Sequence, residues 1–213
     1  MPNRRRRQAS LKRRHPRFTP RPRVLVVCEG DVTEPSYLRE LFRRAQNRIV
    51  VDIDARAGVP KTVVERAVTL KRAAELEARR QRDPFLRYDE VWAVFDVDAH
   101  PNLADALQQA RANNIGLAVS NPCFELWLLL HFRAQNAHIE RAEARTACRE
   151  HMPGYNKLAP IEQLYPLYEQ AIERAKALEK WQRGCDRVGG NPSTGVHHLI
   201  ERIQELAREA VVL

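Results

Sequence analysis

Residues 90–98, EVWAVFDVD, form an apolar, β-prone run that ends in two carboxylates, Asp96 and Asp98. A strand that lacks polar alternation is typical of a parallel sheet covered on both faces. In open parallel sheets ligands bind beyond the carboxyl ends of the strands, where these two residues stand. Side chains alternate along a strand with a period of two, so both carboxylates are predicted to point to the same side.

A pair of neighbouring carboxylates predicts a bound cation. Two anions held close together each resist ionisation unless a cation lies between them. Hard divalent ions such as Mg²⁺ and Mn²⁺ prefer oxygen ligands, so Asp96 and Asp98 are candidate metal ligands. The alternative is that Asp-Val-Asp merely begins a solvated loop before Pro101.

The segments around this run alternate between strand and helix patterns. Residues 24–28, VLVVC, predict a second buried strand, followed by Glu29, a turn at Gly30 and a helix that starts at Thr33 or Glu34. Further strands are predicted at 49–54 and 115–119, and helices at 34–47, 62–82 and 102–113. This alternation predicts an α/β fold with a parallel sheet and helices on both faces. Neither a three-glycine dinucleotide pattern nor a Gly-Lys-Ser/Thr phosphate loop is present, which argues against an ATPase.

The formal net charge of +9 is concentrated at the N-terminus. Residues 1–23 hold ten Arg or Lys and no acid, which leaves 26 basic and 27 acidic residues in the rest of the chain. We therefore predict a disordered basic arm at 1–22 that binds nucleic acid through its phosphates. Anionic membranes and import receptors are alternative partners for such an arm.

Cysteine usage and hydropathy indicate an intracellular protein. The four cysteines are scattered without metal-ligand spacing, which disfavours both zinc and a disulfide framework. No apolar run approaches the ~20 residues that span a bilayer, and no secretory signal is evident. We expect a cytoplasmic location and no membrane partner.

Residues 120–132, SNPCFELWLLLHF, predict a short buried helix with Asn121 as its N-cap and Pro122 at its first position. Two ionisable residues, Glu125 and His131, would be buried in this segment, where a polar group needs a partner. Glu125 either complements the helix N-terminus or takes part in metal or phosphate chemistry. His131 is either a hydrogen-bonded core histidine or a functional group.

The rest of the chain is predicted to be helical at 139–150, 161–183 and 193–211. Two turns interrupt it: GYNK at 154–157, where Lys157 either reaches a phosphate or is simply solvated, and GGNPST at 189–194, with a helix start at Asn191 or Ser193. We divide the chain into the arm, an α/β core at 23–135 and a helical region at 136–213 that packs on the core.

Several of these segments together resemble the RloB-like family, whose core is similar to a Toprim domain. The matching pieces are Glu29-Gly30, Thr33-Glu34-Pro35, FDVD at 95–98, SNPCFELW at 120–127 with His131-Phe132, GYNK at 154–157 and NPST at 191–194. They extend from residue 24 to about 199, and their order makes the set more specific than any one piece. The fold that the resemblance implies is a Toprim-like, Rossmann-like sheet with a helical C-terminal extension.

The resemblance also implies functional roles. In Toprim proteins a glutamate after the first strand and an Asp-x-Asp after the third bind divalent metal. This implies Glu29 as metal ligand or general acid/base, and Asp96 and Asp98 as metal ligands. The other motif residues are candidates for the site: Glu125 for catalysis, and Glu34, Asn121, His131, Asn191 and Thr194 for substrate binding. RloB-like proteins are associated with phage-defence loci, often beside an AAA-type ATPase, which is therefore a candidate partner.

We therefore expect a Mg²⁺- or Mn²⁺-dependent nuclease that cleaves RNA, with tRNA as one candidate, or DNA. Its catalytic residues would be Glu29, Asp96, Asp98 and Glu125, with Lys157 neutralising developing charge. The alternative is a non-catalytic module that binds nucleic acid or an ATPase partner and uses the acids to hold a structural ion.

Overall fold

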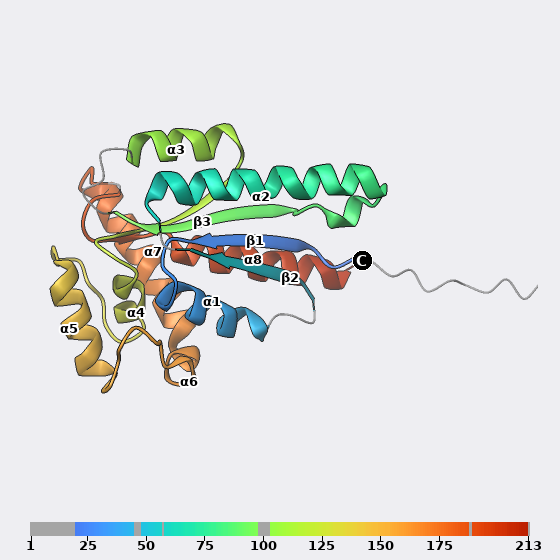
Figure 1. Ribbon diagram of the computed structural model, residues 1–213. Helices are drawn as coiled ribbons and strands as arrows, with labels where there is room; N and C mark the ends of the chain where they lie inside the picture. The colour runs from blue at the N-terminus through green and yellow to red at the C-terminus, as the bar shows by residue number, and fades with distance from the viewer. Residues whose placement is uncertain (1–19, 45–47, 57, 98–102, 188, 213) are drawn as a thin grey trace, which may run out of the picture.

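The computed structural model describes residues 20–44, 48–56, 58–97, 103–187 and 189–212. Asp98 and residues 1–19 of the predicted arm lie outside the described residues. The centre of the molecule is one five-stranded sheet in the order β2-β1-β3-β4-β5 (Figure 1). Its strands are β1 (Arg23–Cys28), β2 (Val50–Ala55), β3 (Glu90–Asp96), β4 (Gly116–Asn121) and β5 (Ser193–Thr194).

The four longer strands are parallel, as predicted. β3 lies between β1 and β4, with Cys28 opposite Val94 and Asp96 opposite Ser120. The carboxyl ends of β1 and β3 therefore meet at one edge of the sheet, and Glu29 follows one of them directly. The mixed α/β architecture with a largely parallel sheet is confirmed, and it is Rossmann-like.

Two layers of helices cover the sheet (Figure 1). α2 (Pro60–Gln81) and α3 (Leu103–Ala112) pack on the face that carries Leu25, Val27 and Phe95. The opposite face, with Val24, Val26 and Cys28, is buried under α1 (Thr33–Arg43), α4 (Glu125–Leu130) and the C-terminal helices. Successive residues of β1 thus enter two different cores, which explains why its residues 24–28 are all apolar.

The start of α4 differs from the prediction. Asn121 belongs to β4 and pairs with Ser193, while its side-chain Nδ2 donates to the backbone oxygen of Gly189 at 3.1 Å. It therefore cannot cap a helix, and Pro122 does not occupy a first helical position, because α4 begins only at Glu125. The predicted N-cap was wrong because pairing with a distant strand outweighs a local capping preference.

The C-terminal region is broken more often than predicted. It contains α5 (Arg141–His151), α6 (Ile161–Leu164), the 3₁₀-helix Tyr165–Leu167, α7 (Tyr168–Gly184) and α8 (Val196–Val212). A single helix over 161–183 was wrong, because Pro166 lacks the backbone N–H that a continuous α-helix requires there. A shorter 3₁₀-helix, Pro84–Leu86, precedes β3.

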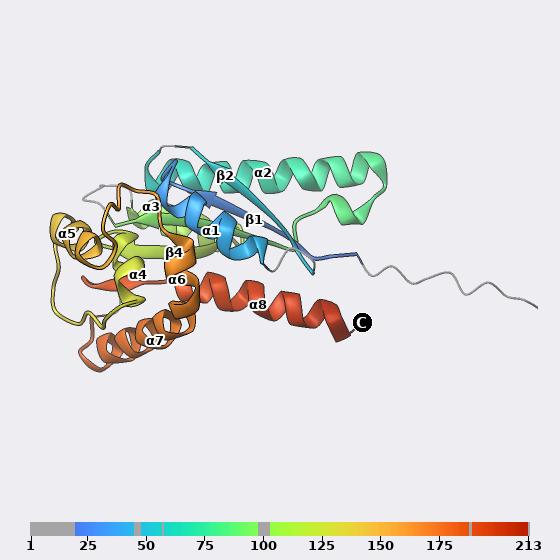
Figure 2. The same cartoon turned by 90° about the horizontal axis from the view of Figure 1, so that it is seen from below.

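The second turn also differs from the prediction, since Ser193 and Thr194 form β5 rather than the start of a helix. β5 pairs antiparallel with β4, and Ser120 Oγ lies 3.0 Å from Thr194 Oγ1. α8 then packs against β4, on the side of the sheet opposite α2 (Figure 2). Across the described ranges of the chain, no helix combines the length and the apolarity that a membrane span requires.

Candidate functional site

The candidate site begins where β1 and β3 end. The backbone N–H of Glu29 donates to the carbonyl of Val94 at 2.9 Å, which extends the ladder between the two strands by one residue. In return, the backbone N–H of Asp96 donates to Glu29 Oε2 at 2.9 Å. The parallel pairing thus brings two predicted metal ligands together at one sheet edge.

The turn into α1 adds a third acid, Glu34. Its side chain is 7% exposed and folds back over Gly30. A Cβ on residue 30 would lie only 2.0 Å from Glu34 Oε2, so any larger residue at Gly30 would displace that carboxylate. Gly30 is therefore needed for this close approach.

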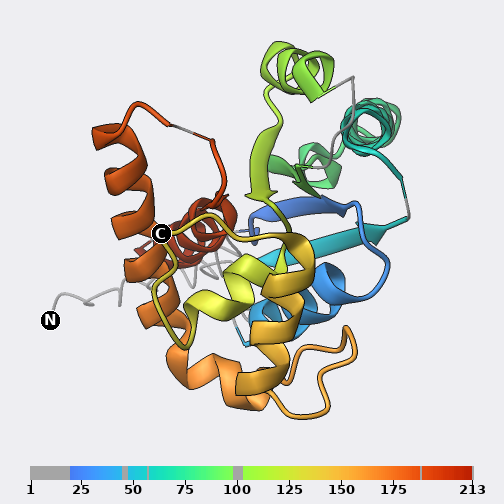
Figure 3. The same ribbon diagram turned by 90° about the vertical axis from the view of Figure 1, so that its left-hand side faces the viewer.

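α4 and α5 complete the site from the other side, where they lie against each other (Figure 3). Glu125, 5% exposed, is the first residue of α4. Its Oε1 accepts from Arg145 Nε at 3.1 Å and from the hydroxyl of Tyr155 at 3.5 Å. One turn earlier on α5, Arg141 Nη1 lies 3.3 Å from Asp96 Oδ2. The Arg141–Asp96 pair attaches α5 to the sheet edge, and the Arg145–Glu125 pair attaches it to α4.

A cavity of about 170 Å³ collects these groups, which we call the acidic cavity. Among the described residues, five carboxylates from the ends of β1 and β3, the turn after β1, α1 and α4 line it together with three cations: Glu29, Asp31, Glu34, Asp96, Glu125, Arg141, Arg145 and Lys157. Five of these eight residues were predicted as site residues from the sequence. Asp31 and the two arginines were missed, although the i,i+4 spacing of Arg141 and Arg145 places them on one face of a predicted helix.

The electrostatics of the acidic cavity favour a cation. Burial raises the pKa of Asp96 well above its usual value, the negative charge of Glu34 raises it further, and Arg141 opposes this only in part. Burial also raises the pKa of Glu34, with Glu125 and Glu29 adding to the shift. Because the carboxylates repel one another, an additional positive charge among them would be stabilising.

The donor set of the acidic cavity fits Mg²⁺ or Mn²⁺, since carboxylate oxygens are the ligands that these hard ions prefer. Glu29 and Asp96 would be held there by the strand ends. Asp98, two residues after the end of β3, is outside the described part of the chain, so a complete ligand set of Glu29, Asp96 and Asp98 remains a prediction.

A second group of side chains meets the geometric requirement for a shared metal ion. Among the described residues, Glu179, His197 and His198 place their ligand atoms within 4.8 Å of one another, so this cluster can hold a metal. This cluster was not predicted from the sequence. The adjacent histidines were the only available signal, and their carboxylate partner lies on another helix.

Of the five candidate substrate-binding residues, only Glu34 is among the described residues that line the acidic cavity. The other four do not line it: Asn121, His131, Asn191 and Thr194. Asn121 contacts Gly189, Thr194 contacts Ser120, and Asn191 exchanges two hydrogen bonds, of 3.1 and 2.9 Å, with the backbone of Ile139. These contacts tie the 189–194 turn to β4 and to the start of the C-terminal region. The structure therefore gives all three a supporting position, and their role in substrate binding stays a prediction.

His131 has the environment of a core histidine. It is fully buried, with Nδ1 3.0 Å from the carbonyl of Trp127 and Nε2 3.0 Å from the Tyr37 hydroxyl. A carbonyl only accepts, so Nδ1 carries the proton and Nε2 accepts from Tyr37. Burial lowers the pKa of His131 to about 4, which keeps the ring neutral. Of the two interpretations left open by the sequence, these contacts favour the hydrogen-bonded core histidine.

Comparison with known proteins adds one assignment. Residues 24–203 match a family model described as RloB-like protein. No curated protein and no solved structure matches the chain. The family match includes every element from β1 to the middle of α8, and with them all the described residues that line the acidic cavity. Because the match extends over far more than half of its length, this chain belongs to the RloB-like family.

Proposed function

We propose that the acidic cavity is the active centre of a divalent-metal-dependent nuclease that cleaves phosphodiester bonds. The observation that carries this proposal is the meeting of Glu29, after the first strand, with Asp96, at the end of the third, through a hydrogen bond of 2.9 Å. The Toprim resemblance implies a metal-binding glutamate and an Asp-x-Asp at these two positions.

Glu29 and Asp96, with Asp98, would hold Mg²⁺ or Mn²⁺. Such an ion polarises a phosphoryl oxygen and lowers the pKa of bound water. Glu34 and Glu125 add negative charge to the same cavity and strengthen its preference for a cation. Buried positions for Glu34, Asp96 and Glu125 keep this charge in surroundings of low polarity, where it acts more strongly than in water.

The three cations of the acidic cavity support a phosphate-containing substrate. Ion pairs with Asp96 and Glu125 hold Arg141 and Arg145 at the cavity wall. Guanidinium groups suit phosphate oxygens because their N–H groups match them in pairs, whereas Lys157 supplies a point charge. A substrate phosphate can therefore be bound and oriented by these groups while the carboxylates serve the cation.

Nucleic acid is the substrate that fits the rest of the chain. The ten basic residues among residues 1–23 would attract a polyanion and increase its local concentration. We propose RNA, including tRNA, or DNA as the substrate. Phage defence with an AAA-type ATPase as partner is the biological setting that the family resemblance implies.

Cleavage assays with one conservative variant test the proposal. Purified protein is incubated with labelled RNA and DNA, with and without Mn²⁺ or Mg²⁺, alone and with the candidate ATPase added. We expect discrete new ends that require the metal, and their loss in Asp96→Asn, which keeps the side-chain size and removes the anion. Asp105→Asn, on the exposed surface of α3, is the matched control and should retain activity.

Two results would contradict the proposal. Full metal-dependent cleavage by Asp96→Asn would place the active centre elsewhere. Binding of nucleic acid without cleavage under every condition would favour the non-catalytic module.

A further inference from the structure

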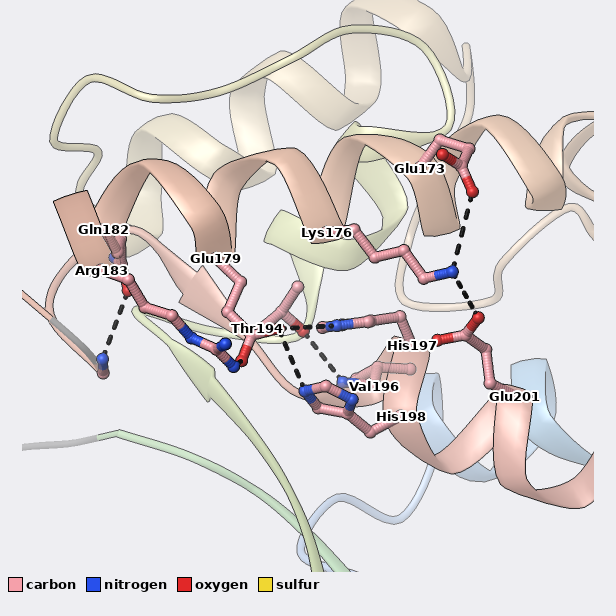
Figure 4. A network of polar contacts seen from close by, with 11 residues as sticks. Glu173, Lys176, Glu179, Gln182, Arg183, Thr194, Val196, His197, His198 and Glu201 are labelled. Atoms are coloured by element: carbon pink, nitrogen blue, oxygen red, sulfur yellow. Dashed lines mark hydrogen bonds and ion pairs between the residues drawn. The ribbon is translucent and has the colours of Figure 1, made fainter.

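A second polar cluster, which we call the His–Glu cluster, lies between α7 and α8 (Figure 4). It consists of Glu179, near the end of α7, and of His197 and His198, in the first turn of α8. Glu179 Oε2 lies 3.4 Å from His197 Nε2 and 3.3 Å from His198 Nε2. One carboxylate oxygen thus faces two imidazole nitrogens at nearly equal distances.

These distances are long for direct charged hydrogen bonds. N–H···O bonds between charged groups are typically about 2.7–2.9 Å. His138 and Glu140 of this chain show such a bond at 2.8 Å. By contrast, tetrahedral zinc with ligand bonds of about 2.0–2.1 Å separates its ligand atoms by roughly 3.3–3.4 Å. The spacing in the His–Glu cluster therefore matches ligands around a shared ion better than a pair of hydrogen bonds.

The surrounding contacts hold the cluster in place before any ligand binds. Lys176 of α7 lies 2.6 Å from Glu201 of α8, which joins the two helices one turn from the cluster. Arg183 Nη2 lies 2.5 Å from Glu179 Oε1, so this second oxygen is occupied and Oε2 is left to face the histidines. Hydrogen bonds that orient a ligating carboxylate in this way are typical of metal sites.

The contacts of His197 single out one ring nitrogen for a ligand role. The side chain is fully buried at the start of α8. Its Nδ1 has no hydrogen-bond partner among the described residues, so Nε2 is the nitrogen that takes part in polar contacts.

One side of the cluster opens to a cavity of about 180 Å³, lined by Glu179 and His198 together with Ser193 and Thr194. We propose that Glu179, His197 and His198 bind a zinc-class divalent transition metal through two imidazole nitrogens and one carboxylate oxygen, with a further coordination position open to this cavity. Water or a small anion would occupy that position, because two neutral imidazoles and one carboxylate leave a Zn²⁺ ion with net positive charge. Three protein ligands with an open position are the arrangement of reactive rather than purely structural zinc.

This site is separate from the acidic cavity. The two cavities have no described lining residue in common, and the ligand chemistry differs, because imidazole nitrogens select zinc-class ions while an all-carboxylate set selects Mg²⁺ or Mn²⁺. The metal would link α7 to α8 next to β5, and so stabilise the C-terminal region against the sheet. The proposal therefore stands or falls independently of nuclease activity.

Zinc titration of the full-length protein tests the inference. Chelator-treated protein is titrated with ZnCl₂ against a chromogenic competitor, in excess MgCl₂ that occupies hard oxygen sites. We expect one zinc per chain, micromolar affinity and a higher melting temperature. The affinity is expected to be moderate because no described residue forms the outer hydrogen bond to Nδ1 of His197 that usually supports a ligating imidazole.

Variants of accessible residues separate the site from adventitious binding. Removing only a residue that hydrogen-bonds to a metal ligand costs about 10- to 100-fold in metal affinity. Removing a ligand itself should cost more, so His198→Ala and Glu179→Gln should each weaken zinc binding at least about 100-fold. His198 is half-exposed, and its replacement should leave the protein folded. Two controls should keep wild-type affinity: His138→Ala, which removes an exposed histidine with a single carboxylate partner, and Cys185→Ser, which removes the exposed thiol. Asp96→Asn should also bind zinc normally.

The absence of zinc binding by the wild-type protein would overturn the inference. Equal affinity in the wild type and in folded His198→Ala and Glu179→Gln would overturn it as well, since it would place the zinc elsewhere.

Discussion

The backbone N–H of Asp96 donates a 2.9 Å hydrogen bond to the carboxylate of Glu29, which joins the end of β3 to the residue that follows β1. Glu29 therefore has two separable properties. It accepts a hydrogen bond that closes the sheet edge, and it places a negative charge in the acidic cavity. A comparison of two substitutions can distinguish them.

Glu29→Gln retains an oxygen that can accept from Asp96 but removes the charge. We expect this variant to keep its stability and to lose metal-dependent cleavage. Glu29→Ala removes both properties and should in addition lose about 1.5–3 kcal/mol of unfolding free energy, the usual range for a hydrogen bond to a charged group. Urea denaturation and cleavage assays measure the two effects, with Glu65→Gln on the exposed face of α2 as control. Undiminished cleavage by Glu29→Gln would remove this residue from the chemistry.

Glu125→Gln tests whether a buried carboxylate on α4 belongs to the metal environment. We expect the metal concentration for half-maximal cleavage to rise, because the acidic cavity loses one of its five described carboxylates. Stability should fall by only about 0.3–1 kcal/mol, the size of a first-turn charge effect. The measurements are a metal titration of activity and a melting curve, with Glu143→Gln in the first turn of α5 as control. Wild-type metal dependence in Glu125→Gln would assign this residue a purely structural role.

Buried His131 predicts acid destabilisation. Its folded-state pKa of about 4 lies below the ordinary value of 6.5, so between these pH values the unfolded chain binds a proton that the folded protein excludes. Stability should be unaffected above pH 6.5 and fall as the pH drops to 4. The loss from this one residue should reach roughly 3 kcal/mol, at 1.36 kcal/mol per pKa unit.

Urea denaturation between pH 7.5 and about 4.5 measures this loss, in a window set by the two pKa values of the residue. His131→Phe should be less stable at neutral pH, because Tyr37 and Trp127 lose their partner, but its stability should vary less with pH. His197, whose pKa is also lowered to about 4, will keep part of the dependence in both proteins. An identical pH dependence in wild type and His131→Phe would contradict the assignment, and exposed His138→Ala should match the wild type.

The basic arm should supply affinity rather than chemistry, because residues 1–23 carry the whole excess of positive charge. Replacing residues 1–21 by a neutral Gly/Ser segment should weaken nucleic-acid binding and flatten its salt dependence. If about half of the charges contact phosphates, the log–log slope should decrease by roughly 3 to 5 units. Binding at several salt concentrations provides the measurement. A slope equal to that of the wild type would show that the arm does not contact the phosphates.

Much of the fold could be predicted from local sequence patterns. The apolar runs at 24–28 and 90–96 predicted buried parallel strands, because a strand covered on both faces has no polar alternation. Parallel pairing places the carboxyl ends of such strands at one edge of the sheet. Because Glu29 directly follows β1 and Asp96 ends β3, this pairing predicted that the two residues meet. Glu125 and Lys157 were candidates from their local sequence context and Glu34 from the family resemblance, and all three line the same acidic cavity.

Other features depend on contacts between distant segments, and only the tertiary structure decided them. β5 has two residues, too few for any periodicity, and exists because it pairs with β4, which also takes Asn121 out of the expected helix cap. Arg141 and Arg145 reach the acidic cavity because α5 packs against α4. The His–Glu cluster forms because α7 and α8 lie side by side, which brings Glu179 to histidines eighteen and nineteen residues later in the chain. A local pattern specifies which face of an element is buried, but the partner of that face is set by the packing of the whole chain.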